Sequence, residues 1–492
     1  MTEILLSFEE TTNGKNGDLL SQRKGDKPIK IGLCACGYFE YWRMYPGLRE
    51  KVVTDMDFIA SRLKKKYHVI YPGMIDSLDA GDNAGEYFRN ENIDVIIITE
   101  GTYCPDYFVH QVLGHLGGQI PILCFASQPH RTTDFSADYG ECLRNSGTMG
   151  LVQLTGGFRK MGKYKKYESI VGSIDQEETF DRISKCIDVY QTLHNLKQMT
   201  IGTVGHVFRG MYDFNYDKTS VSGLFGPHLM DVQIGHLVDI LNEISSTQER
   251  LDLLCEKTKS EFQVSGLSDD EIRRSSRLAI ALDELIERYK LDGLVLLGQH
   301  LVEKHANASC YLGIANILSR DRAIVVTEGD VIGCIMSKIC KDLTGVNPFF
   351  GEWEEIDIDR NAVFLLGHGF IDPKATRRDS PVKVGPACEN WGFQGNSVGF
   401  EATYPPGPVT LTHAIQDPDG WRLLVSEGEH LDTPVLPINE CSMIVRVEKK
   451  ITDYFQEIMS YGFSHHVIVT PGLIGKQLEM VARQLGMKVC RI

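Results

Sequence analysis

Short, fully apolar runs alternate with amphipathic stretches over the first part of the chain. Such runs begin at Ile29 (IKIGLCACG) and recur over 93–101 (IDVIIITEG) and 120–128 (IPILCFASQ). The stretches between them, such as MDFIASRLKKKY, carry apolar residues three and four positions apart, which is the spacing of one helix face. Apolar strands that alternate with amphipathic helices predict a parallel sheet covered on both faces, so we expect a doubly wound α/β domain over 28–180.

The same pattern resumes after a linking helical stretch, FDRISKCIDVYQTLHNLKQ. The runs MTIGTVGHVF, LDGLVLLGQH and AIVVTEGD are expected to be buried strands, and the stretch 248–289, rich in Glu, Arg and Leu, is expected to be long helix. We therefore expect a second doubly wound parallel-sheet domain over 181–345. Residues 1–27 are polar and are interpreted as a lead-in to the first domain.

Beyond residue 345 the pattern changes to short apolar segments broken by Gly and Pro. Examples are AVFLLGHGF, VGFEATYPPGPVTLTHAI and WRLLVSEGEH, and the chain closes with a helical stretch and a final strand, MKVCRI. This spacing indicates an antiparallel β-rich domain over 346–492. The predicted fold class is therefore α/β, with two doubly wound parallel-sheet domains followed by a C-terminal antiparallel β-rich domain.

Composition narrows the range of functions. The 492 residues suggest about three domains at roughly 150 residues each. The 51 Lys and Arg stand against 66 Asp and Glu, a net charge of −15, which argues against a nucleic-acid partner because phosphate binding needs fields of positive charge. No run approaches the roughly 20 apolar residues of a membrane span, and the N-terminus lacks a signal sequence. Thirteen Cys, an odd number scattered along the chain without a pairing pattern, fit a reducing compartment, so we expect a cytoplasmic protein.

Two short segments resemble known binding motifs but lack residues that those motifs require. The segment 156–164 (GGFRKMGKY) imitates the phosphate loop GxxxxGK[ST], but Tyr164 stands where a hydroxyl must bind Mg²⁺. With no GxGxxG after the first strand either, we expect no nucleotide cofactor. Cys34 and Cys36 form a CxC pair that no other Cys or His completes at the usual zinc spacing, so we interpret both as ordinary buried thiols.

Four acidic or imidazole side chains stand at predicted strand ends or in Gly-rich turns. Glu328 follows AIVVT, Glu352 lies in NPFFGEWEEID, His368 in FLLGHGF, and His466 is the second His of GFSHHVIVTPG. Taken singly, each has an ordinary structural interpretation, such as a Glu that stabilises a helix N-terminus. Taken together, two carboxylates and two imidazoles suit a divalent ion such as Mn²⁺, Mg²⁺ or Co²⁺, and the lack of thiolates argues against structural zinc.

These motifs are similar to those of the L-arabinose isomerase and L-fucose isomerase superfamily of metal-dependent aldose–ketose isomerases. The similarity covers most of the chain and is strongest over TEGDVIGCIMSKICKDLTGVNPFFGEWEEID, LLGHG and SHHVIVTPG. The interval between the two glutamates resembles fucose isomerases, whereas LLGHG and SHH resemble arabinose isomerases. The resemblance implies that Glu328, Glu352, His368 and His466 bind Mn²⁺, with Co²⁺ or Mg²⁺ as substitutes, and that the two glutamates also transfer protons.

The resemblance also implies sugar contacts. The segment ending in IPILCFASQ is similar to a first-domain segment with a substrate-facing Gln, here Gln128, and VGHVFRGM is similar to a sugar-contacting turn, which places His206 and Phe208 near the pocket. His465 is a further candidate for binding the sugar. Gln299 and Trp391 are candidates for choosing between epimers.

Some assignments within the motifs stay open. In GEWEE, Glu354 or Glu355 could bind the metal ion in place of Glu352. In SHH, His465 could bind it in place of His466. The resemblance implies a homotrimer or homohexamer in which the first domain of one subunit covers its neighbour's pocket. The aromatic-rich segment 37–48 fits that covering role, and it equally fits simple packing on the adjoining helix.

The implied activity is the interconversion of an aldose and its ketose through a cis-enediol. The nearest type is L-arabinose to L-ribulose, and L-fucose or D-arabinose isomerisation is the alternative. A non-catalytic sugar-binding protein of the same fold and a different metal enzyme, such as a hydrolase or an aldolase, are the remaining possibilities. The expected partner is in every case a small molecule.

Overall fold

The computed structural model describes residues 27–492 except 119, 245–247, 298–300 and 388–396. The predicted lead-in falls almost entirely outside the described residues, and so do Gln299 and Trp391, the two candidates for epimer choice. The predictions for them stay predictions. All statements below concern the described part of the chain.

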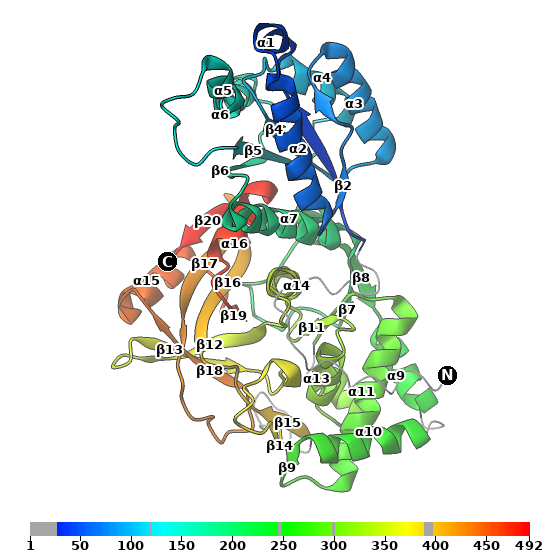
Figure 1. Cartoon of the computed structure of the whole chain (residues 1–492). Helices are drawn as coiled ribbons and strands as arrows, with labels where there is room; N and C mark the ends of the chain where they lie inside the picture. The colour runs from blue at the N-terminus through cyan, green and yellow to red at the C-terminus, as the bar shows by residue number, and fades with distance from the viewer. Residues whose placement is uncertain (1–26, 119, 245–247, 298–300, 388–396) are drawn as a thin grey trace.

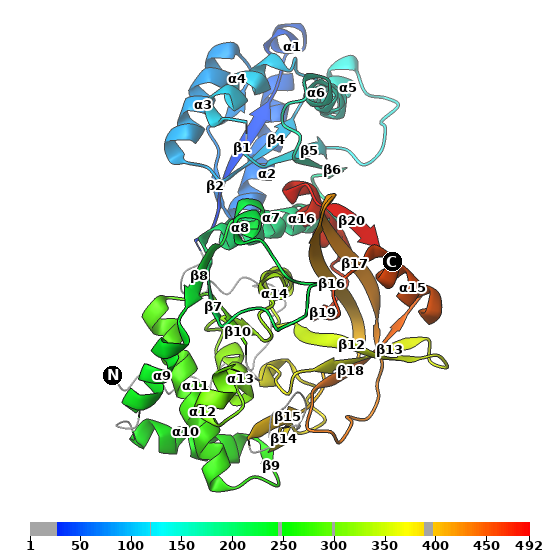
Figure 2. The same cartoon turned by 180° about the vertical axis from the view of Figure 1, so that it is seen from behind.

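The first sheet is parallel and six-stranded, with helices on both faces (Figures 1 and 2). Its order is β2-β1-β4-β5-β6, with β3 paired to β1. Its strands are β1 (Lys30–Cys36), β2 (His68–Ile70), β3 (Met74–Ile75), β4 (Val95–Glu100), β5 (Ile122–Gln128) and β6 (Tyr167–Ser173). The three apolar runs predicted as strands form β1, β4 and β5, which are almost completely buried because helices cover both sides.

The helices of this region begin and end at recognisable caps. The Ser77 and Asp138 side chains accept bonds from the first turns of α3 and α5. The helices are α1 (Phe39–Met44), α2 (Leu48–Lys64), α3 (Leu78–Glu91), α4 (Tyr107–Leu116), α5 (Tyr139–Arg144), α6 (Gly147–Met161) and α7 (Glu177–Gln198). Most of the segment that imitates a phosphate loop lies in α6, so it is helical rather than a loop.

A second parallel sheet has four strands in the order β11-β10-β7-β8. Its strands are β7 (Thr200–Val204), β8 (His228–Val232), β10 (Gly293–Leu296) and β11 (Ile324–Val326). The helices around it are α8 (Lys218–Phe225), α9 (Ile234–Glu243), α10 (Gln248–Glu261), α11 (Asp269–Tyr289), α12 (Glu303–Ala306), α13 (Tyr311–Ser319) and α14 (Val331–Thr344). This arrangement confirms a second parallel-sheet region.

The expectation of one long helix over 248–289 is wrong. The chain leaves α10 at Glu261, forms the short strand β9 (Gln263–Val264) and restarts at α11. Gly266 adopts φ +69, and Ser268 then closes a capping box with Glu271. A left-handed glycine followed by a strong N-cap separates two helices whose periodicity is otherwise continuous.

The C-terminal region is a seven-stranded, mostly antiparallel sheet in the order β16-β19-β12-β13-β18-β17-β20, and pairing of β16 with β17 closes it into a barrel. Its strands are β12 (Phe349–Asp357), β13 (Ala362–Gly367), β16 (Gly407–Asp417), β17 (Gly420–His430), β18 (Ser442–Val447), β19 (His466–Pro471) and β20 (Lys488–Arg491). A small sheet joins β9 to β14 (Lys383–Pro386) and β15 (Val398–Glu401). The other helical segments here are η3 (Pro373–Ala375), α15 (Ile451–Tyr461) and α16 (Gly475–Leu485).

The long helix α7 lies between the first sheet and the rest of the molecule in both views (Figures 1 and 2). It contacts β6 on one side and α14 and α16 on the other, so one hydrophobic core runs through all three regions. The predicted fold class is confirmed, while the residue boundaries of the three domains stay predictions. Across the described residues, every helix is too short or too polar to cross a lipid bilayer.

Candidate active site

The turn that follows β11 holds Glu328 in an uncommon conformation. Glu328 adopts φ +62, a left-handed value that a residue with a side chain rarely takes, and Gly329 follows at φ +83. The Phe208 N–H donates to the Glu328 carbonyl at 2.9 Å, and a Cβ at position 329 would lie only 2.6 Å from the His206 carbonyl oxygen. Strain of this kind persists where the surroundings fix it and collects at functional sites.

Strand register explains how two other members of the set meet. In the antiparallel ladder between β12 and β19, Glu352 lies directly opposite His466, so their side chains share one face of the barrel. His368 follows β13, whose last residue pairs with the residue before Glu352. The Phe350 ring lies 5.8 Å from the His368 ring and 4.7 Å from the His466 ring, between centroids, and so packs against both imidazoles.

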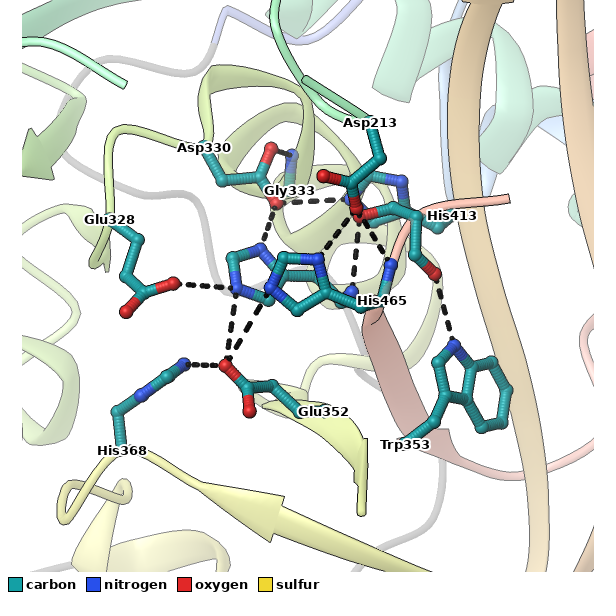
Figure 3. Close-up of polar contacts among 11 residues, drawn as sticks. Asp213, Glu328, Asp330, Gly333, Glu352, Trp353, His368, His413 and His465 are labelled. Atoms are coloured by element: carbon teal, nitrogen blue, oxygen red, sulfur yellow. Dashed lines mark hydrogen bonds and ion pairs between the residues drawn. The ribbon is translucent and has the colours of Figure 1, made fainter. Parts of the chain in front are cut away.

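The four predicted side chains therefore converge. Glu328, Glu352, His368 and His466 each place one donor atom within 4.8 Å of the others. Figure 3 shows the polar groups of Glu328, Glu352 and His368 turned toward a common centre. His466 Nε2 lies 3.2 Å from the Glu328 carboxylate and 3.8 Å from that of Glu352, and His368 Nε2 lies 3.3 Å from Glu352. Glu328 and His466 are fully buried, whereas the Glu352 side chain is 15% exposed. We call these four residues the Glu–His cluster.

The imidazoles keep both carboxyl groups of the cluster ionised. Burial on its own would raise the pKa of Glu352, but the hydrogen bond and charge of His368, aided by the two other histidines, lower it to about 2. Burial likewise opposes ionisation of Glu328, and the bond from His466 brings the pKa of Glu328 below its ordinary value. The arrangement thus offers two carboxylates, rather than two neutral acids, at neutral pH.

A residue that the sequence interpretation missed orients His466. The buried Asp330 carboxylate accepts from His466 Nδ1 at 2.9 Å and lies 3.1 Å from His413 Nε2 (Figure 3). Asp330 also caps α14 by accepting from the Gly333 N–H at 2.7 Å. With Nδ1 fixed in this way, His466 turns Nε2 toward the cluster, as carboxylate–imidazole pairs do around metal ions. The sequence could have indicated this residue, because Asp330 lies two residues after Glu328 in the same TEGD motif.

A second missed residue, Asp213, comes from the loop after β7. Its carboxylate accepts from His465 Nδ1 at 2.6 Å, from the His465 N–H at 2.9 Å and from the Ser464 hydroxyl at 3.1 Å. The neighbouring Phe214 ring is buried and stacks on His466 with centroids 4.6 Å apart. This loop therefore fixes both histidines of the SHH motif from the opposite side of the site.

The geometry separates the competing residues within the motifs. Glu354 is the extra residue of a β-bulge between Trp353 and Glu355, and both Glu354 and Glu355 are exposed. The His465 side chain is 37% exposed, with Nε2 3.8 Å from Glu352, so it lies at the edge of the cluster. The structure thus brings Glu352 and His466, rather than their neighbours, into the centre.

The predicted sugar-contact residues fall into two groups. His206 and Phe208 belong to the turn that packs on Glu328 and are therefore close to the cluster, and His206 also lines a cavity of about 620 Å³ at the ends of β7 and β8. Gln128 ends β5 in the first sheet, where its amide donates to the Thr148 hydroxyl at 2.6 Å. Gln128 is not a member of the Glu–His cluster, so its predicted contact stays a prediction.

The donor set fits a divalent cation. Two ionised carboxylates offset a charge of +2, and mixed oxygen and imidazole donors suit Mn²⁺, Co²⁺ or Mg²⁺. The hydrogen bond from His466 Nδ1 to Asp330 fixes the orientation of the His466 ring, so that Nε2 is available to bind a metal ion.

Comparison with known proteins agrees with these motifs. Residues 382–492 match the sequence model of the C-terminal domain of L-fucose isomerase. The chain is 24% identical over 356 residues to a sulfoquinovose isomerase of Priestia aryabhattai, covering 70% of this chain and 76% of that protein, and 23% identical to one of Alkalicoccus urumqiensis, covering 70% and 77%. These matches support the resemblance of the motifs to the L-arabinose isomerase and L-fucose isomerase superfamily. Together they identify the chain as a sugar isomerase enzyme.

Among solved structures, a glucose–galactose binding protein of Geobacillus stearothermophilus, GanP, aligns at 12% identity over 65% of this chain and 92% of that one. The TM-score of this alignment is 0.15.

Proposed function

We propose that this sugar isomerase is metal-dependent and that the Glu–His cluster is its catalytic centre. The observation that carries the proposal is the convergence of two ionised carboxylates and two imidazoles within 4.8 Å, in a largely buried position between the second sheet and the barrel. Glu328, Glu352, His368 and His466 would hold the ion, for which Mn²⁺ is the proposed identity. When bound, such an ion polarises neighbouring sugar oxygens and stabilises the charge of an enediolate.

Proton transfer falls to the two glutamates. Moving a carbonyl from C1 to C2 requires that a proton leave C2 and that one arrive at C1. Glu352 is the more accessible of the two carboxylates, whereas Glu328 is fully buried. His368 and His466 would have to be neutral to hold the ion, and the charge of the ion would then keep both carboxyl groups ionised. Either carboxylate could accept a proton and return it in the reverse reaction. Positioned groups of this kind contribute about 10²–10⁴-fold.

His465 is suited to holding the sugar at the mouth of the site. Asp213 fixes its ring at 2.6 Å and leaves Nε2 on the side of Glu352, where 37% of the side chain is exposed. A ring fixed in this manner can donate to or accept from a sugar hydroxyl without losing rotamer freedom on binding. We assign His465, His206 and Phe208 to sugar binding in this proposal.

The substrate is proposed to be an aldohexose or a 6-substituted aldohexose. The relatives that match are named for the isomerisation of sulfoquinovose, and the matched domain is that of L-fucose isomerase. The L-arabinose-type assignment relies on the short LLGHG and SHH elements, which leaves arabinose as the alternative. We further propose a homotrimer or homohexamer, with Gln128 reaching a neighbouring subunit's pocket.

A substrate panel tests the proposal. The purified protein would be incubated with L-arabinose, D-arabinose, L-fucose, D-galactose and sulfoquinovose, and the ketose formed would be measured. We expect at least one aldose to be converted without fragmentation, the activity to disappear after treatment with a chelator, and Mn²⁺ to restore it.

Three results would contradict the proposal. Unchanged turnover by metal-free protein would remove the role of the ion. Binding of sugars without conversion would favour a sugar-binding protein, and release of smaller fragments would favour an aldolase.

A further inference from the structure

His413 is a buried histidine of the barrel that the proposed mechanism does not use. It lies in β16, which pairs with β19, the strand that begins with His466, and helix α14 packs against both strands. Both histidine side chains are 0% exposed. His413 Nε2 lies 3.1 Å from Asp330 Oδ2, the same oxygen that accepts from His466 Nδ1 at 2.9 Å. The two imidazoles thus share one oxygen of one buried carboxylate.

The carboxylate between the two imidazoles is tightly enclosed. Its other oxygen, Oδ1, accepts from the Gly333 N–H at 2.7 Å, and a Cβ at position 333 would overlap Asp330 Oδ2. A carboxylate only accepts hydrogen bonds, so each of its neighbours must donate. In the described part of the chain, removal of the His413 imidazole would leave Oδ2 with the bond from His466 only.

Another buried histidine of the barrel shows the difference between the two kinds of role. His430 in β17 uses both ring nitrogens, since Nδ1 donates to the Ile444 carbonyl at 3.0 Å and Nε2 lies 3.1 Å from the Thr403 hydroxyl. His413 has no partner for its buried Nδ1 among the described residues, an arrangement that costs about 1–3 kcal/mol. Its hydrogen bond goes instead to Asp330, at the start of α14 and outside the barrel strands. This difference indicates that His413 serves Asp330 rather than the barrel.

We propose that His413 is a positioning residue for the metal site: its Nε2–H holds Asp330, and Asp330 holds His466 with Nε2 directed toward the Glu–His cluster. The inference rests on the proposed function, because it requires that the cluster bind a divalent ion. It adds β16 to that function, a strand that supplies no member of the cluster. In this role His413 touches neither the ion nor the sugar and acts only through Asp330.

Titration of the metal-free protein with Mn²⁺ tests the inference, with the free ion followed by electron paramagnetic resonance. His413→Leu removes the donor to Asp330 and should weaken Mn²⁺ binding about tenfold, the lower end of the effect of outer partners of metal ligands. His413→Gln can place an amide N–H where Nε2 lies and should bind Mn²⁺ within about threefold of wild type. His413→Asn is one methylene shorter, cannot place its N–H there, and should weaken binding as His413→Leu does.

A double-mutant cycle separates positioning from a general effect on the barrel. Because His413 acts through Asp330, His413→Leu should change the Mn²⁺ affinity by less than about twofold in the Asp330→Asn background. His430→Leu removes another buried histidine of the same barrel, away from Asp330, and should leave the Mn²⁺ affinity of the otherwise unchanged protein within about twofold of wild type.

The outcomes distinguish failure of the inference from failure of the proposed function. Absence of Mn²⁺ binding by the wild type would overturn the proposed function, and this inference with it. Normal binding by the wild type would overturn the inference alone if His413→Leu bound equally well, if the Gln and Asn variants had equal affinities, if Asp330→Asn did not suppress the loss, or if His430→Leu caused the same loss. Thermal unfolding checks that the variants fold, and the comparison of Gln with Asn decides the matter if His413→Leu does not.

Discussion

The carboxyl ends of the two parallel sheets bury acidic groups in opposite ways. After β11 in the second sheet, Glu328 lies among imidazoles and is ionised. At the corresponding edge of the first sheet, Glu100 ends β4 beside Cys36, its register partner on β1, and lies among thiols. Both glutamates are at most 1% exposed, so their surroundings, rather than their burial, distinguish them.

Among the residues that the structure describes, the groups that shift the pKa of Glu100 are cysteines and an acidic residue, Asp106, rather than cations. Cys34 and Cys36 place their sulfur atoms 3.6 Å apart, and neither carboxylate oxygen of Glu100 has a hydrogen-bond partner in the described part of the chain. Burial, together with the charge of Cys36, raises the pKa of Glu100 well above its ordinary value. A Cβ at Gly150 would overlap the Glu100 carboxylate, so the nearby helix α6 packs against it through a glycine.

The contrast shows what makes a buried carboxyl group chemically useful. Strand ends provide position in both sheets, but only the carboxyl groups of the Glu–His cluster lie beside imidazoles, which favour the ionised form. In the proposed metal-bound state the imidazoles would be neutral and the ion would supply the positive charge. A neutral carboxyl group among thiols can neither bind a divalent ion strongly nor accept a proton at neutral pH. Six substitutions, grouped in four predictions, test this distinction.

Neutralising either glutamate of the Glu–His cluster should have the largest effect. Glu328→Gln and Glu352→Gln each keep the side-chain shape but remove a charged donor and a proton acceptor, so turnover should fall by about 10²–10⁴-fold. Steady-state kinetics with saturating Mn²⁺ would measure this loss, and circular dichroism would confirm the fold. Normal turnover by Glu352→Gln would remove that residue from the mechanism.

Asp330→Asn should have an intermediate effect. Asparagine still caps α14 through its side-chain oxygen, but it removes the negative charge between His413 and His466. Loss of such an outer carboxylate typically costs 10–100-fold in metal affinity or activity. Titration of metal-free protein with Mn²⁺ would show the change, and unaltered affinity would reduce Asp330 to a helix cap.

Glu100→Gln should affect stability and not turnover. The pKa of Glu100 is raised on folding, so the native state binds this proton more tightly than the unfolded chain, and wild-type stability falls as pH rises above the ordinary glutamate value. The variant lacks this loss and should gain stability relative to wild type on going from pH 5 to pH 8, by about 1.4 kcal/mol for each pH unit over which Glu100 is protonated in the native state but not in the unfolded chain. Chemical unfolding at both pH values measures the free energy of unfolding of wild type and variant. A difference between them that does not change with pH would refute the raised pKa of Glu100.

Glu354→Gln and Glu355→Gln should have the smallest effect. Both residues are exposed beside the bulge of β12, outside the Glu–His cluster. Surface substitutions of this kind usually change stability by no more than about 0.5 kcal/mol. The variants also serve as controls for Glu352→Gln, because each removes one negative charge from the same strand. A large loss of activity in either would shift the catalytic role away from Glu352.

Much of this arrangement could be predicted from the sequence. The apolar runs ending at Cys36, Glu100 and Gln128 specify buried parallel strands, and the motifs name all four residues that converge. Their convergence itself depends on long-range register, since Glu328 and His466 meet across 138 positions.

Other features depended on local detail that periodicity does not encode. The bulge that excludes Glu354 and the glycine turn that divides 248–289 each involve a few backbone dihedrals. The thiols were predicted to be buried, and they are, but that Cys34 and Cys36 share a face with Glu100 follows only from the pairing of β1 with β4. The sequence alone therefore could not predict which residues of distant segments lie opposite each other in the sheets.

The opposition of Glu352 and His466 across β12 and β19 has one more consequence. A slip of a single residue between these strands would reverse every side chain of β12, pointing Trp353 inward and Glu352 to the outside. The barrel would keep nearly all its backbone hydrogen bonds between strands, but Glu352 would no longer lie beside His466. The site therefore requires the observed register between β12 and β19, and a mutation or a misfolded state that shifts this register would destroy the site even if both strands still form.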